Sequence, residues 1–264
     1  MTPLKNLYLV KSLKLSKSKP SLLGLMILFD FLMIVLGFIL FQFSSVFAGS
    51  LYLPQNITAL FVYIGLTLLY ILLVLFIYSF FKFSILRTIG SFFGKTDKSY
   101  SRLGKFYTLN LLLLGIFSSE YILINFLLFS SKASYKVIIL FIIGIPMLAF
   151  SYVLLGISHS LFYQGSGVRK SISKSFKITF TNLRIYKETV FVMLIAVILY
   201  TILLYLIGYV IQISTAKNYF AYLTAYSYFQ KIAFVFSVIL LYFFLLKNQI
   251  VVYMFSKEND LPKH

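Results

Sequence analysis

The sequence has no cysteine and no tryptophan among its 264 residues. Without cysteine, the chain has no disulfide, no thiolate metal ligand and no cysteine nucleophile. Only two histidines occur, and one of them is His264 at the end of the sequence, which excludes a polyhistidine metal site. No phosphate-binding loop, dinucleotide-binding fingerprint or zinc motif is present, so we expect no cofactor and no metal centre.

Charged residues are also scarce, at 11% of the sequence, whereas soluble domains carry about 25%. Hydrophobic residues make up 61%, above the roughly 45–50% of a soluble protein. So much apolar surface requires lipid to cover it. Because no polar stretch is long enough to form a separate soluble domain, we interpret residues 1–264 as a single integral membrane domain.

Six apolar stretches reach the length of about 20 residues that a helix needs to cross the hydrocarbon core. The strands of a membrane barrel are about half as long and alternate polar with apolar positions, which these stretches do not. A helix also satisfies its backbone hydrogen bonds internally, as lipid requires. The sequence therefore predicts an all-α, polytopic transmembrane helical bundle. The predicted spans are Leu22–Phe47, Ile57–Phe81, Phe106–Phe129, Val137–Phe162, Thr189–Ile213 and Phe229–Leu246.

The basic residues fall mostly on one side of this predicted membrane. Of the 24 Lys and Arg residues, all but Lys132, Lys136, Lys217 and Lys231 lie in the two tails and in the second and fourth connections. Cytoplasmic loops carry an excess of Lys and Arg, so the asymmetry predicts both termini in the cytoplasm and the chain in the cell membrane. The net charge of +18 then indicates contact with anionic headgroups rather than with nucleic acid.

The two long basic connections each carry an amphipathic pattern. In the fourth, apolar residues recur every three or four positions, which indicates a helix lying in the headgroup layer. They are Val168, Ile172, Phe176, Thr179 and Leu183, and the candidate headgroup contacts on the other side are Arg169, Lys170, Lys174 and Lys177. The second connection repeats the pattern less regularly over residues 85–93. A docking site for a cytosolic partner is the alternative interpretation.

Two carboxylates fall within the predicted spans, where an ionisable residue costs about 2.5–3.5 kcal/mol on insertion scales. Glu120 lies about 21 Å into the third span, and a proton- or cation-linked role in a transport path is one hypothesis. A protonated or hydrogen-bonded glutamate that joins helices is the alternative. Asp30 lies near 12 Å in the first span, or at the interface facing the lysines of the N-terminal tail. Because these depths differ, we do not expect the two carboxylates to share a proton.

Two other residues of the fourth span have a possible role. His159 lies near its basic end, between Ser158 and Ser160, and we interpret it as an interfacial histidine, with a base or proton relay as the alternative. Pro146 removes a helix hydrogen bond, so we expect a kink there and consider it a candidate hinge.

A stretch of the fourth connection resembles a known group of proteins. Its residues SISKSF at 171–176, then Thr181-Asn182-Leu183 and a long apolar span, are similar to prokaryotic six-span proteins found as the membrane domain of some glycerophosphodiester phosphodiesterases. The resemblance covers Gly165–Ile213 and implies a helical bundle with no known activity of its own. Since a soluble phosphodiesterase domain is absent from this sequence, the resemblance does not extend to that activity.

Three functions fit these observations. The first is a non-enzymatic transport-related or envelope accessory protein, with a membrane protein or a second copy of the chain as partner. The second is a membrane-embedded enzyme acting on lipids, which would need clustered acid, base or metal ligands. The third is a structural or lipid-organising protein held by helix packing and basic loops.

The predicted orientation has a direct test. A reporter that is active only in the cytoplasm, fused to either end of the chain, should be active in both fusions because the basic residues hold both tails inside. An inactive reporter at one end would mean an odd number of spans, and at both ends an inverted protein.

Overall fold

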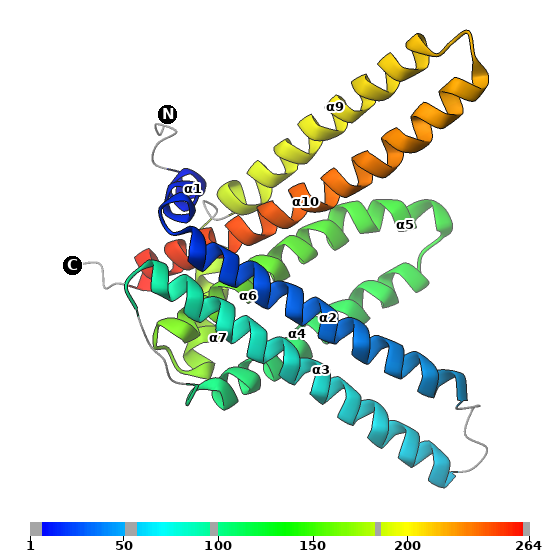
Figure 1. Ribbon diagram of the computed structural model, residues 1–264. Helices are drawn as coiled ribbons and strands as arrows, with labels where there is room; N and C mark the ends of the chain where they lie inside the picture. Colours follow the sequence, from blue (N-terminus) through cyan, green and yellow to red (C-terminus); the bar gives the residue numbers. More distant parts are fainter. Residues whose placement is uncertain (1–6, 51–56, 96–99, 183–185, 261–264) are drawn as a thin grey trace.

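The computed structural model describes residues 7–50, 57–95, 100–182 and 186–260 (Figure 1). Regular secondary structure in these residues is helical throughout, and six helices are long and apolar enough to cross a membrane. The prediction of an all-α bundle is therefore confirmed, and the chain is a multi-pass membrane protein. The α-helices are α1 (Tyr8–Ser18), α2 (Pro20–Ser50), α3 (Ile57–Phe92), α4 (Leu103–Phe129), α5 (Ala133–Ile139), α6 (Ile145–Gln164), α7 (Val168–Thr181), α9 (Val192–Ser214) and α10 (Tyr219–Asp260), with π-helical segments η2 (Leu140–Gly144) and η3 (Lys187–Phe191).

The long helices form three hairpins, α2–α3, α4 with α5–α6, and α9–α10. Figure 1 shows them converging where α1, α7 and the last turns of α10 lie, and diverging toward their opposite tips. We call the convergent end the basic end, because it carries the basic side chains of α1 and α7. The three hairpins thus pack against one another at the basic end rather than along their whole length.

The buried hydrophobic residues are also concentrated at the basic end. At the basic end the hydrophobic core contains Ile89 of α3, Phe106 of α4, Ile157 of α6 and Ile250 of α10, all fully buried. The α3 helix has 36 residues, so it is about 54 Å long, against a hydrocarbon thickness of about 30 Å. Its last turns therefore continue past the predicted end of the span and pack into this core. The apolar residues Ile85, Leu86, Ile89 and Phe92, predicted to lie on the lipid-facing side of an interfacial helix, are buried in protein instead, and Phe93 is half-buried.

The first helix docks onto this core through two acidic residues. The backbone N–H of Tyr8 donates to Oε2 of Glu188 at 2.6 Å, and the Tyr8 hydroxyl donates to Glu258 of α10. A carboxylate at a helix N-terminus satisfies an otherwise unpaired amide and interacts favourably with the helix dipole. The tail that carries α1 is therefore an integral part of the fold.

The amphipathic helix predicted in the fourth connection is present as α7, although Leu183 lies outside the described residues. Its inner face carries small hydroxyl residues, and the buried Oγ atoms of Ser158 on α6 and Ser175 on α7 lie 2.6 Å apart. This face, which includes Thr179 of the predicted apolar stripe, therefore packs against α6 of the same chain, whereas Val168, Ile172 and Phe176 of that stripe are half-buried. Arg169, Lys170 and Lys177 are exposed on the other side, as the sequence predicts, and Lys174 is half-buried.

Pro146 follows the π-helical segment η2 without a break in the helix. Proline has no N–H to donate to the carbonyl one turn earlier, and the wider π turn accommodates the change in hydrogen bonding. The structure thus has a π segment at the point where the sequence predicts a kink, and a hinge role for Pro146 stays a prediction.

Candidate functional site

A set of polar side chains lies where the hairpins enter the core. Lys19 donates to the carbonyl oxygen of Phe92 at 3.1 Å, which places the start of α2 beside the end of α3. Asp30 and Lys82 each lie about ten residues from that contact, hence about 15 Å toward the tips of the hairpins. We call this set the polar layer; it consists of Asp30, Ser79, Lys82, Asn110, His159, Tyr242 and Gln249.

One half of the polar layer is a hydrogen-bonded chain across α3, α4 and α6. The Ser79 hydroxyl donates to the carbonyl oxygen of Leu75 at 2.7 Å. Its oxygen therefore accepts from Nδ2 of Asn110, at 2.8 Å. This orients Oδ1 of Asn110 toward Nε2 of His159, at 2.6 Å, so Nε2 must carry a proton and donate it. Each bond fixes the direction of the next.

The other ring nitrogen of His159 is left without a partner. Nδ1 is fully buried and makes no hydrogen bond with any described residue. The ring packs against Phe106, at 4.9 Å between centroids, and against Tyr78 at 6.2 Å. In the neutral histidine, Nδ1 is a bare acceptor, and an unsatisfied buried acceptor costs about 1–3 kcal/mol. His159, interpreted from sequence as an interfacial residue, is instead fully buried at the end of this hydrogen-bonded chain.

The other half of the layer joins α2, α3 and α10. The Tyr242 hydroxyl donates to Oδ2 of Asp30 at 3.0 Å, and Nζ of Lys82 donates to Oε1 of Gln249 at 3.0 Å. Asp30 is only 6% exposed, so the hydrogen bond from Tyr242 replaces part of the hydration that it loses. Its hydrogen-bond partner is thus Tyr242 of α10, not a lysine of the N-terminal tail.

Glu120 lies outside the polar layer. It is half-buried and accepts a hydrogen bond from the hydroxyl of Ser151 on α6. The structure therefore does not bring Glu120 and Asp30 together, and the bond between α4 and α6 agrees with the helix-joining alternative.

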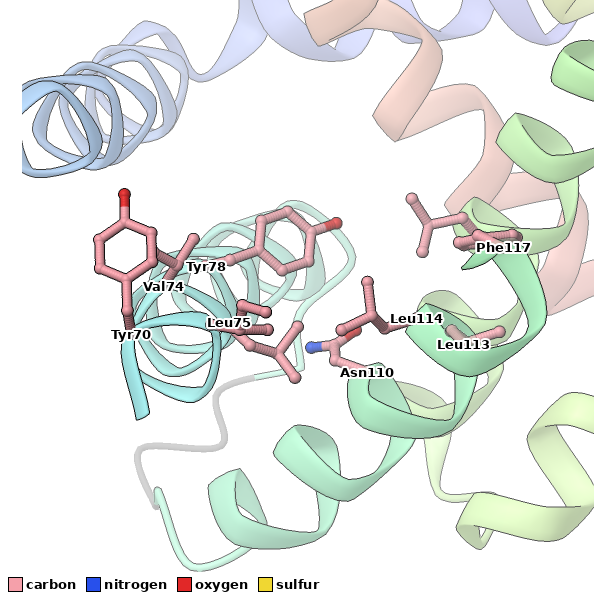
Figure 2. A pocket seen from close by; sticks show the side chains of 10 residues that line it. Tyr70, Val74, Leu75, Tyr78, Asn110, Leu113, Leu114 and Phe117 are labelled. Carbon is pink, nitrogen blue, oxygen red and sulfur yellow. The ribbon is translucent and has the colours of Figure 1, made fainter. Parts of the chain in front are cut away.

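A cavity of about 530 Å³ adjoins the polar layer on the side of the hairpin tips (Figure 2). Tyr78 and Asn110 supply polar groups at the end nearest the layer, and none of the described residues that line the cavity is charged. The lining residues are Tyr70, Ile71, Val74, Leu75 and Tyr78 of α3, Asn110, Leu113, Leu114 and Phe117 of α4, and Leu155 of α6. Such a surface suits an apolar ligand with a small polar end.

Sequence reasoning missed Lys82, His159, Tyr242 and Gln249 as parts of one site. Lys82 was assigned to a connection, although it continues the helical spacing of Ile71, Leu75 and Tyr78, which is the one signal for its place. No group of three His, Cys, Asp or Glu residues suited to a metal ion occurs in the described part of the chain.

No protein family, curated protein or solved structure matches this chain. The resemblance to the membrane domain of glycerophosphodiester phosphodiesterases therefore stays a prediction.

The central position of Asn110 generates a prediction. Asn110→Leu should lower the free energy of unfolding by about 1–3 kcal/mol, because Nε2–H of His159 loses its acceptor in a buried site. The measurement is thermal unfolding of the purified protein in detergent. The matched control is Asn125→Leu, since the Asn125 side chain is exposed and bonds only to the carbonyl oxygen of Tyr121 in its own helix. Equal stability of the two variants would contradict the hydrogen-bonded chain in which Asn110 accepts from His159.

Proposed function

We propose that this protein is a non-enzymatic accessory protein of the cell membrane, transport-related or envelope-associated, that holds a partner membrane protein beside its α9–α10 hairpin. The observation that carries the proposal is that α9 has no buried residue along its length. Because other residues of the chain cover so little of α9, its surface is available for contact with another membrane protein.

The contact between α9 and α10 occupies a single stripe of α9. Tyr200 donates to the carbonyl oxygen of Ala233 at 3.3 Å and accepts from the Ser237 hydroxyl at 3.2 Å. Gly208, two turns later, faces Phe229 of α10: a Cβ there would lie 3.6 Å from the phenyl ring. Small residues in such a stripe allow close helix approach. The remaining faces of α9 are apolar and exposed, with Tyr205 at 72%.

The polar groups support an accessory role more than a complete carrier. A proton- or ion-coupled carrier needs ionisable groups facing a path for its substrate. Here Glu120 accepts a hydrogen bond from Ser151, Asp30 accepts one from Tyr242, and Lys82 donates one to Gln249. The cavity beside them is lined mainly by apolar side chains. Such contacts are typical of polar groups that hold helices in fixed positions.

The exposed basic side chains of α7 provide a second contact, with the headgroups of the membrane. Arg169, Lys170 and Lys177 project from one end of the molecule, on the side that the charge count assigns to the cytoplasm. Anionic headgroups attract such residues with about 1 kcal/mol for each charge near the surface. We therefore assign them to headgroup contact, which would hold the basic end against the membrane.

The proposed partner contact is testable by photo-crosslinking in the native membrane. A photoreactive amino acid at Tyr205 should give a discrete adduct with another membrane protein, because that side chain points away from α10. The matched control is Leu204, the neighbouring residue, which lies half-buried on the α10 side. It should give no such adduct. In the same assay Glu120→Gln should leave the adduct unchanged, since the amide oxygen still accepts from Ser151.

Other products of this assay would point to other functions. Adducts with lipid alone would contradict the proposal and favour the lipid-organising alternative. Adducts only with a second copy of the chain would indicate a structural homo-oligomer.

Headgroup contact predicts a different measurement. Replacing Arg169, Lys170 and Lys177 together by Gln should reduce the anionic lipid that copurifies with the protein, because three favourable charge interactions are lost. Native mass spectrometry counts the retained lipids. The control replaces Lys132, Lys136 and Lys217, three exposed lysines near the tips of the hairpins, in the same way. An equal loss in both variants would show that α7 has no special part in headgroup binding.

A further inference from the structure

The cavity between α3, α4 and α6 has no part in the proposed partner contact, which lies on α9. It extends along α3 from Tyr70 to Tyr78, a rise of about 12 Å, within a membrane span. Apolar cavities of this kind exclude water, because a water molecule needs two to four polar partners. In a bilayer the medium available to fill the space is hydrocarbon.

The cavity is open on one side. Ile71, Val74 and Leu114 line it and yet keep 41%, 38% and 36% of their surfaces exposed. A lipid chain can therefore enter from the bilayer without a change in the fold. The volume of about 530 Å³ falls in the range of about 300–1,000 Å³ that ligand pockets have.

A single hydrocarbon chain is narrow enough to lie along the groove. Charged or strongly polar solutes are disfavoured, because none of the described residues that line the cavity carries a charge to replace their hydration.

The end of the cavity nearest the polar layer has hydrogen-bonding groups. Figure 2 shows the Tyr78 hydroxyl directed from α3 toward α4, and the Asn110 side chain extends from α4 into the same space. Asn110 already bonds Ser79 and His159, so it is held in place. A phenolic hydroxyl can donate to the carbonyl oxygen of an ester. The site thus matches a molecule with a long apolar chain and an uncharged carbonyl at one end.

We propose that this cavity binds one acyl chain of a glycerolipid, and that the Tyr78 hydroxyl donates a hydrogen bond to the ester carbonyl of that chain. The lipid comes from the leaflet on the basic side, since Tyr78 and Asn110 lie at that end of the cavity. The tail lies against Val74, Leu114 and Phe117. The site is independent of the accessory role: α9 can hold a partner whether or not the cavity is filled.

The test uses the full chain in phosphatidylcholine vesicles with a trace of phosphatidylcholine that carries a diazirine in the middle of one chain. After illumination, mass spectrometry locates adducts along the chain. We expect adducts on residues 70–78 and 113–117 in excess of those on the exposed faces of α9. Leu114→Trp should fill the cavity and reduce these adducts to the level on α9. Leu112→Trp, on the same helix at an exposed position outside the cavity, should leave them unchanged.

A second comparison tests the hydrogen bond and does not depend on how Leu114→Trp folds. An ether-linked analogue of the probe lacks the carbonyl acceptor and should label residues 70–78 about two- to tenfold less than the ester, as the loss of one hydrogen bond implies. Tyr78→Phe should abolish this difference by lowering ester labelling alone. Uniform labelling of all apolar faces in the unmodified protein, or equal labelling by ester and ether probes, would overturn the proposal. A crosslinked dimer through residues 70–78 would do so too, because it would identify a second copy as the occupant.

Discussion

The constraint on which this structure depends is that a polar group buried in or beside hydrocarbon must find a partner within the protein. The chain from Ser79 through Asn110 to His159 meets that constraint across three helices, with the exception of Nδ1 of His159, and the bonds of Tyr242 to Asp30 and of Lys82 to Gln249 meet it across three. Since α3 belongs to both groups, the polar layer connects five spans at one level. The hairpins are therefore fixed relative to one another at this level, while their tips diverge (Figure 1).

The layer also separates two kinds of packing. Toward the basic end the helices bury large side chains such as Phe106 and Tyr253 against one another. Toward the tips each hairpin has mainly its own two helices for contact, and side chains such as Leu199 and Phe234 remain exposed. Hydrophobic burial drives the association of helices in the first region. In the second, lipid is as apolar as the side chains, so only close packing and hydrogen bonds favour association. The contacts of Tyr200 with Ala233 and Ser237, and of Gly208 with Phe229, are examples between α9 and α10.

Much of the fold could be predicted from sequence, because length and hydropathy determine which segments cross a bilayer. The helix at Val168–Thr181 was also predictable, since its apolar spacing is a local property. The ends of α3 and α10 were not. Their last turns look like basic connections in sequence, and only contacts with distant helices show that Ile89 and Ile250 are buried. The polar layer was missed for the same reason: Asn110 and His159 are 49 residues apart and are joined only by the crossing of α4 and α6.

The excess length of α3 and α10 has a consequence for the response of the protein to its membrane. Both helices exceed the hydrocarbon thickness, so a thicker bilayer can be matched by lowering the tilt of each hairpin, and a thinner one by raising it. Because the three hairpins are anchored at a common base, these tilts change the lateral spacing of their tips together. We therefore expect the lateral distance between the hairpin tips to depend on the thickness of the membrane.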